Sequence, residues 1–110
     1  MLTLSGDSRV FVYHEPMDLR KGFEGLGAMV EQTFCMELTS GAYFAFLNRR
    51  KDRMKVLYWD GDGLVIWYKR LEKGQFCKPK SGNSMMRRRD FLMLLEGVIP
   101  KRMNTRYSTV

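Results

Sequence analysis

With 110 residues, 45% of them hydrophobic, and a formal net charge of +7, the chain can bury one modest core and leaves no room for a second domain. No apolar run approaches the length of a membrane span, and the first residues lack the basic and apolar regions of a signal peptide, so we expect a cytoplasmic protein without a membrane partner. Cys35 and Cys77 stand apart and the chain has one histidine, so we expect two packed thiols, no metal site and no cofactor.

The first predicted elements are a strand and a helix. A strand is expected over 9–14, ending at Pro16, whose ring removes a backbone donor. A helix is expected over 17–34, because apolar residues recur there at spacings of three and four. Three glycines inside it lower the stability of a helix, so they indicate close approach of another element or a bent or short helix. The residues of the predicted apolar face are Leu19, Phe23, Leu26, Val30 and Phe34, and the glycines are Gly22, Gly25 and Gly27.

Three strands are predicted next. A buried strand over 42–47 is followed by a charged connection and by two runs rich in β-branched and aromatic residues, 54–59 and 64–71. The residues between these runs, 60–63, alternate Asp and Gly, which is typical of a tight hairpin turn that needs positive φ. Short links favour an antiparallel β-meander with a central hairpin, packed against the amphipathic helix, and hence an α+β fold.

The C-terminal part is predicted to be less regular. A polar loop over 78–84 precedes a short helix that begins near Arg87 and ends near Gly97. We therefore expect a single compact α+β domain over 1–97 and a basic C-terminal tail over 98–110.

Three blocks, in order along the chain, carry a family resemblance. They are MDLRKGFEGL at 17–26, SGAYFAFLNRR at 40–50 and LYWDGDGLVIWYKRLEKGQF at 57–76. Together they closely resemble the TnpB family of accessory proteins, the product of the second open reading frame of insertion sequence 66 elements, encoded beside the transposase. The resemblance extends from about Arg9 to Gly97 and is weakest after Phe76. It implies a role in transposition together with the transposase, and it supplies no established catalytic residue.

The turn carboxylates Asp60 and Asp62 are the first candidates for chemistry. Alternating Asp and Gly is similar to the start of a calcium loop, but Val65 stands where that loop has its glycine and Leu71 where it has its glutamate, which excludes an EF-hand. A metal-dependent nuclease would need several converging carboxylates, for which Glu72 is a third candidate. Turn chemistry is the better interpretation, with Asp60, Gly61, Asp62 and Gly63 as the family-motif turn.

Basic residues give the stronger functional signal, because charge is divided unevenly along the chain. Residues 1–48 hold 3 Lys/Arg against 6 Asp/Glu, and residues 49–110 hold 16 against 6. Cations brought to phosphates release counterions, so three basic clusters predict a DNA-binding surface if they share one face; a solvated surface that serves solubility is the alternative. The clusters are Arg49, Arg50, Lys51 and Arg53; Lys69, Arg70 and Lys73; and Arg87, Arg88 and Arg89.

Other residues could add to such a surface. Tyr58, Trp59, Trp67 and Tyr68 could stack on bases where exposed, although core packing explains aromatics within strands better. Arg20 and Lys21 are possible contacts with a partner or DNA, and an ordinary ion pair with Glu24 is the alternative.

We therefore expect a non-catalytic accessory protein for transposition of a bacterial insertion element, binding DNA, the transposase or both. Two alternatives remain open. One is a metal-dependent nuclease or strand-processing enzyme built on Asp60 and Asp62, and the other is a protein-interaction module without DNA binding. A small-molecule substrate is not predicted.

Overall fold

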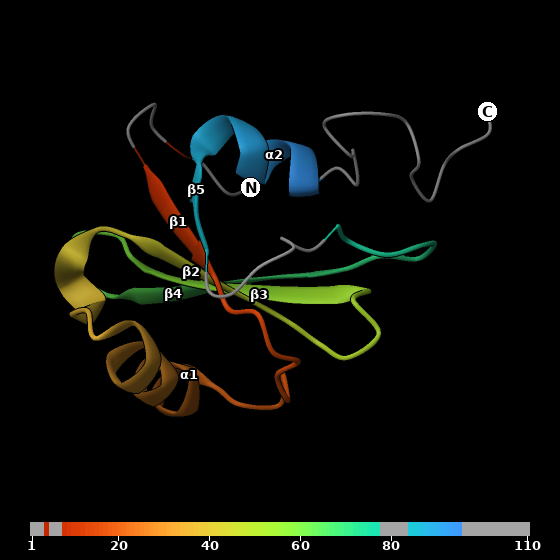
Figure 1. Ribbon diagram of the computed structural model, residues 1–110. Coiled ribbons are helices and arrows are strands. Elements are labelled where there is room, and N and C mark those ends of the chain that lie inside the picture. Colours follow the sequence, from red (N-terminus) through yellow and green to blue (C-terminus); the bar gives the residue numbers. More distant parts are fainter. Residues whose placement is uncertain (1–3, 5–7, 78–83, 96–110) are drawn as a thin grey trace.

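The computed structural model describes residues 4, 8–77 and 84–95. In this part of the chain, two helices cover the two faces of one β-sheet, with α1 below the sheet and α2 above it in the view of Figure 1. The elements in chain order are β1 (Arg9–Val12), α1 (Phe23–Met29), the π-helical turn η1 (Val30–Phe34), the 3₁₀ turn η2 (Leu38–Ser40), β2 (Tyr43–Leu47), β3 (Arg53–Trp59), β4 (Leu64–Arg70), β5 (Ser84–Arg87) and α2 (Arg88–Leu95). The α+β class predicted from the sequence is confirmed.

The five strands follow the order β4-β3-β2-β1-β5. The predicted antiparallel meander is formed by β2, β3 and β4, and the β3–β4 hairpin pairs Trp59 with Leu64 at the turn and Arg53 with Arg70 at its open end. Strand β1 adds to the meander in parallel with β2, because the connection through α1 returns the chain to the end of the sheet from which β1 started. Strand β5 pairs antiparallel with β1 and forms the other edge.

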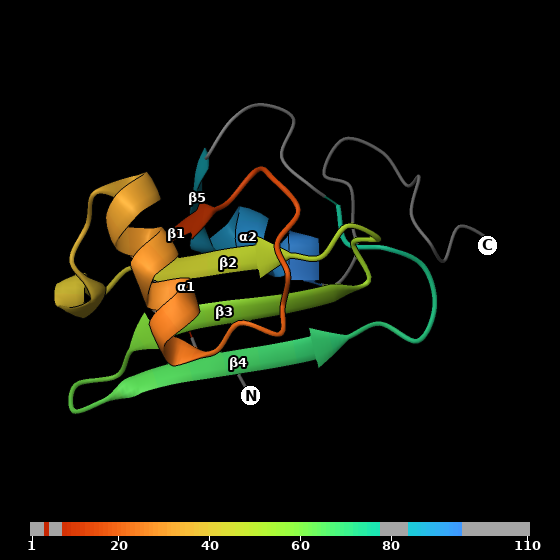
Figure 2. The same ribbon diagram turned by 90° about the horizontal axis from the view of Figure 1, so that it is seen from below.

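Each face of the sheet carries its own hydrophobic cluster, because side chains of a strand alternate between the two faces. Figure 2 shows α1 in front of the sheet and α2 behind it. On the α1 side, Phe44 is fully buried and lies 5.4 Å from Phe34 and 5.8 Å from Phe11, measured between ring centroids. On the α2 side, the fully buried Phe91 of α2 packs with Val10, Val12 and Val56 of the sheet.

The first helix begins later than predicted, at Phe23 and not at residue 17, while its end at residue 34 is confirmed if η1 is included. The Asp18 carboxylate accepts a hydrogen bond from the backbone N–H of Arg20, and the Asp18 carbonyl accepts one from the backbone N–H of Lys21, so a turn replaces the first helical residues. Leu19 is buried, as predicted, but it lies in this loop and not on the helix. Phe23 is 50% exposed, so the prediction that it belongs to the buried apolar face is wrong.

Glycine has an identifiable role at two positions. A Cβ on Gly27 would lie 3.2 Å from the Leu38 side chain, which confirms that this glycine permits close approach of another element. Gly61 has φ of 113° in the β3–β4 turn, as predicted, whereas Gly63 does not need positive φ. The backbone of Cys35 is in the left-handed conformation, with φ of 54°. Its side chain is exposed, so the prediction of a packed thiol is wrong at this position.

The C-terminal elements differ from the prediction at their junction. Residues 84–87 form β5, so the polar loop ends earlier and Arg87 belongs to a strand, not to the helix. The sequence Ser-Met-Met-Arg does not alternate apolar and polar residues, so it has no strand pattern of its own. Pairing with β1 makes this segment a strand. The predicted tail over 98–110 and most of the loop over 78–84 lie outside the described residues.

Candidate nucleic-acid interface

The turn between β2 and β3 is organised by one side chain, Asn48. Its Oδ1 accepts hydrogen bonds from the backbone N–H groups of Asp52, at 3.1 Å, and Arg53, at 3.0 Å, and its Nδ2 donates to Asp52 Oδ1 at 2.7 Å. The hydrogen bond from Asn48 and the charges of Arg50 and Arg53 lower the pKa of the Asp52 carboxyl. The backbone of Lys51 is in the left-handed conformation, with φ of 60°. Asn48 was not predicted as a site residue, although asparagine before a turn is a recognisable turn signal.

This turn is fastened to the segment that follows β4. The Asp52 carbonyl accepts a hydrogen bond from Leu71 N, and the Lys51 carbonyl accepts one from Phe76 N, both at 2.7 Å. Gln75 Nε2 donates to the Arg50 carbonyl at 2.9 Å. Two of the three predicted basic clusters are therefore brought to one end of the sheet. We call this surface the basic end; it consists of Arg49, Arg50, Lys51, Arg53, Lys69, Arg70 and Lys73.

Like charges face each other at the basic end. Arg53 and Arg70 are directly opposite in the β3–β4 ladder, where like-charged pairs destabilise a sheet. Arg70 is partly compensated by Glu72, at 3.1 Å, and within the described residues no carboxylate forms an ion pair with Arg49, Arg50 or Arg53. Excess positive charge thus accumulates on an exposed surface whose backbone is held in place by hydrogen bonds.

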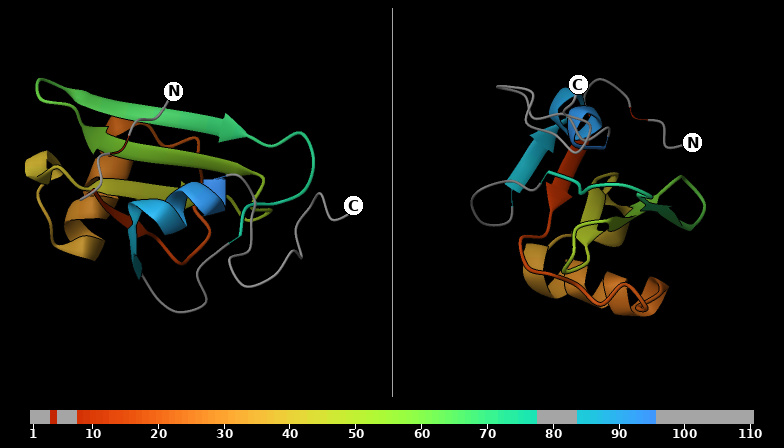
Figure 3. Two further views of the ribbon diagram at one scale, coloured as in Figure 1. Left: turned by 90° about the horizontal axis from the view of Figure 1, so that it is seen from above. Right: turned by 90° about the vertical axis from the view of Figure 1, so that its right-hand side faces the viewer.

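The third predicted cluster lies at the opposite end of the sheet. Arg87, the last residue of β5, faces Arg9 at the start of β1. Because β1 runs away from this end and β4 runs towards the basic end, the strands separate the two groups of cations (Figure 3). Arg88 also has a structural contact, since its Nε donates to the Leu4 carbonyl at 3.2 Å. The condition set for a single DNA-binding surface, that all three clusters share one face, is therefore not supported by the sheet order.

The Arg20 side chain pairs with Asp18 and not with the expected Glu24, and Lys21 has a contact through its backbone. Arg20 Nη2 lies 2.7 Å from Asp18 Oδ2, and hydrogen bonds from Arg20 hold the pKa of the Asp18 carboxyl well below its usual range. The Lys21 carbonyl accepts a hydrogen bond from Lys55 Nζ at 3.1 Å. This contact places the loop before α1 beside β3, two residues along the strand from Arg53.

Aromatic side chains of the hairpin divide into packed and exposed ones. Tyr58 and Trp67 pack against the hydrophobic cluster on the α2 side, as the core interpretation predicted. Tyr68, on the α1 side of β4, is 50% exposed, and Lys55 Nζ lies 5.1 Å from its ring centroid. Lys55, which was not among the predicted site residues, adds a cation near the basic end.

One of the two turn carboxylates, that of Asp60, has a structural role. Asp60 N donates to the Gly63 carbonyl at 3.1 Å, and Asp60 Oδ1 accepts from Asp62 N at 3.4 Å, so the carboxylate closes the turn. Both side chains are exposed. Glu72 follows the other end of β4, so strand length separates it from them. Across the described residues, no group of three or more His, Cys, Asp or Glu side chains could hold a metal ion.

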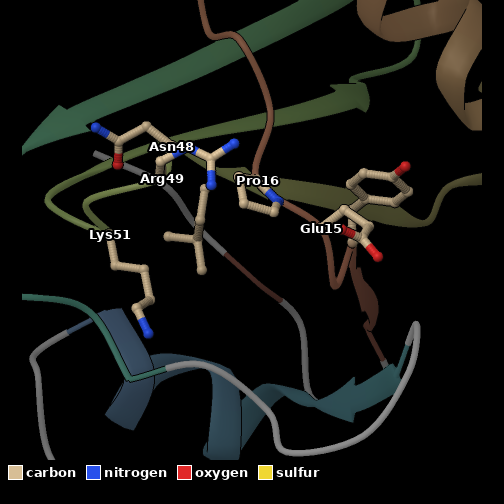
Figure 4. Close-up of a pocket in the computed structure, with 7 residues that line it drawn as sticks. Glu15, Pro16, Asn48, Arg49 and Lys51 are labelled. Atoms are coloured by element: carbon tan, nitrogen blue, oxygen red, sulfur yellow. The ribbon is translucent and has the colours of Figure 1, made fainter.

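A shallow hollow adjoins the basic end. Its volume is about 160 Å³, and Figure 4 shows Glu15 and Pro16 on one side and Asn48, Arg49 and Lys51 on the other. Arg49 and Lys51 of the basic end line this hollow, and Glu15 partly offsets their charge inside it. The other cations of the basic end lie outside the hollow and extend the positive surface that a phosphate backbone could contact.

Replacing Asn48 with alanine is expected to destabilise the protein by about 1–3 kcal/mol, because two backbone donors and Asp52 lose their partner. Urea denaturation of the variant and the parent measures this difference. The matched control is Gln32→Ala, which removes an amide side chain from an exposed position in η1 and should change the free energy of unfolding by no more than about 0.5 kcal/mol. A variant Asn48→Ala as stable as the parent would show that the turn does not depend on this side chain.

Residues 8–105 match the family described as IS66 Orf2 like protein, and the chain belongs to this family. Two relatives from Sinorhizobium fredii are similar to it. The uncharacterized protein y4jC is 35% identical over 100 residues, covering 89% of this chain and 86% of the relative. The uncharacterized protein y4hO is 31% identical over 81 residues, covering 74% and 70%.

No solved structure matches the chain. Family membership confirms the resemblance predicted from the three sequence blocks, and it indicates an accessory role in transposition of an insertion element. In the part of the chain that the structure describes, no helix has the length and apolar character required to cross a membrane.

Proposed function

We propose that this protein is a non-catalytic accessory factor that binds DNA through the basic end during transposition. The observation that carries the proposal is the accumulation of exposed cations there, with Arg53 opposite Arg70 and Arg49 and Arg50 in a turn fixed by Asn48. An arrangement that costs stability in the free protein is relieved when phosphates approach, because each neutralised phosphate also releases counterions.

Contacts of this kind position a protein on DNA without selecting a sequence. We expect the isolated protein to bind duplexes with little sequence preference and with an affinity that falls steeply as salt is added. Fluorescence anisotropy with a labelled duplex from the element end and one of unrelated sequence measures both properties. Failure to bind any duplex or single strand at low salt would assign the basic end to an acidic protein partner, which is the interaction-module alternative.

The transposase is the second proposed partner, and its support is the family to which the chain belongs. Co-purification with the transposase encoded beside it, with and without element-end DNA, tests this part separately. Retention that requires DNA would indicate that both proteins meet on the element end, whereas retention without DNA would indicate a direct protein contact.

Asp60→Asn and Asp62→Asn are expected to support element mobility as the parent does, because asparagine keeps an oxygen acceptor and fits the same turn conformations. The measurement is mobility in cells, with thermal melting of each purified variant to verify folding. Loss of mobility by both folded variants, together with magnesium- or manganese-dependent DNA cleavage by the parent, would contradict the non-catalytic proposal and favour the nuclease.

A further inference from the structure

The outer side of β4 is an unpaired strand edge. Among the described residues, β4 pairs with β3 and with no other strand, and Figure 2 shows it along the border of the sheet. It is seven residues long, has no proline, and begins with Leu64, Val65, Ile66 and Trp67, which are all half-buried. Long, apolar edges of this kind pair with other chains unless they are protected.

The two ends of β4 carry opposite charges. Asp60 and Asp62 precede it, and Lys69 and Arg70 end it. Two copies of β4 placed side by side and antiparallel would therefore bring the acidic start of one beside the basic end of the other, twice, by symmetry. The other edge strand, β5, has the sequence Ser-Met-Met-Arg and contains no carboxylate to provide such complementarity.

Backbone geometry limits the register of such a pair. Only every second residue of β4 directs its N–H and C=O away from β3, so residues of the same parity must face each other across a symmetric antiparallel pair. One register that satisfies this condition places Ile66 opposite its own copy on the two-fold axis. Leu64 then faces Tyr68 of the second copy and Val65 faces Trp67, and the turn residue Asp62, just before the strand, comes next to Arg70 of the second copy.

We propose that the protein forms a homodimer by antiparallel pairing of two β4 strands in this register, giving one continuous sheet across both copies. The pairing covers the half-buried side chains of β4 with aliphatic and aromatic neighbours, including Tyr68, which is 50% exposed in the single chain. Arg70 exchanges its exposed contact with Glu72 of its own chain for Asp62 of the second copy. This inference concerns the protein alone and does not depend on DNA binding.

Charge reversal tests the proposed register. Sedimentation velocity of the full chain without DNA is expected to show a monomer–dimer equilibrium. Asp62→Arg and Arg70→Asp should each raise the dimer dissociation constant by about tenfold, because each turns two attractive contacts into repulsive ones. The double variant Asp62→Arg/Arg70→Asp should recover the parent affinity. A monomer at every concentration, or a dimer unaffected by either single reversal, would overturn the proposal.

A cysteine cross-link tests the two-fold axis independently. In a background with Cys35→Ser and Cys77→Ser, Ile66→Cys should form a disulfide-linked dimer under mild oxidation, because directly opposite residues of antiparallel strands have Cα separations within disulfide range. Met85→Cys is the matched control on the other edge, since Met85 is 52% exposed. No cross-link through residue 66, or equal cross-linking through residue 85, would overturn the proposal.

Discussion

Replacing Arg49, Arg50 and Arg53 together by glutamine is expected to weaken duplex binding about 100-fold at low salt. An exposed ion pair contributes up to about 1 kcal/mol, and three such contributions correspond to roughly two orders of magnitude in affinity. The slope of log affinity against log salt concentration should also fall by about 2.7, because three fewer phosphates are neutralised. Anisotropy titrations of the parent and the variant at several salt concentrations measure both quantities.

The control removes the same charge from the opposite end of the sheet. Arg9, Arg87 and Arg89 are exposed there, and Arg9 faces Arg87 across the β1–β5 ladder. Their replacement by glutamine should change affinity much less, since these cations lie away from the basic end. Equal losses in the two triple variants would contradict a localised interface and would indicate that DNA responds only to net charge.

The largest loss of stability is expected for Phe44→Ala. Phe44 is fully buried between the sheet and η1 and contacts the rings of Phe11 and Phe34. Removing a buried phenyl ring costs about 3–5 kcal/mol, a large part of the roughly 5–15 kcal/mol by which a typical domain is stable. Urea denaturation measures the change, with loss of cooperative unfolding as the limiting result.

Phe23→Ala is the matched control for this prediction. Phe23 is half-exposed at the start of α1, so truncation removes little buried area, and alanine is a better helix former. We expect its free energy of unfolding to stay within about 1 kcal/mol of the parent. A loss at Phe23 as large as that at Phe44 would show that the hydrophobic cluster on the α1 side extends beyond the buried residues.

The candidate site was predictable as a set of residues but not as a surface. Arg49, Arg50, Arg53 and Arg70 are conspicuous in the sequence because cations are concentrated in two short segments. Their proximity depends on pairing β3 with β4 and on hydrogen bonds from the segment after β4 to the turn before β3. The separation of Arg87 from this group depends on β5, a strand without a sequence pattern strong enough to reveal it.

By itself, the sequence determined the hairpin β3–β4, its Asp-Gly turn and the α+β class. These features depend on neighbouring residues, since alternation, β-branching and positive φ at Gly61 act over a few positions. Only the tertiary structure decided the parallel pairing of β1 with β2, the start of α1 after the Asp18 turn, and the ends of the sheet at which the cations lie. These depend on contacts between segments far apart in the chain, where burial of Leu19 and pairing of β5 with β1 outweigh local propensity.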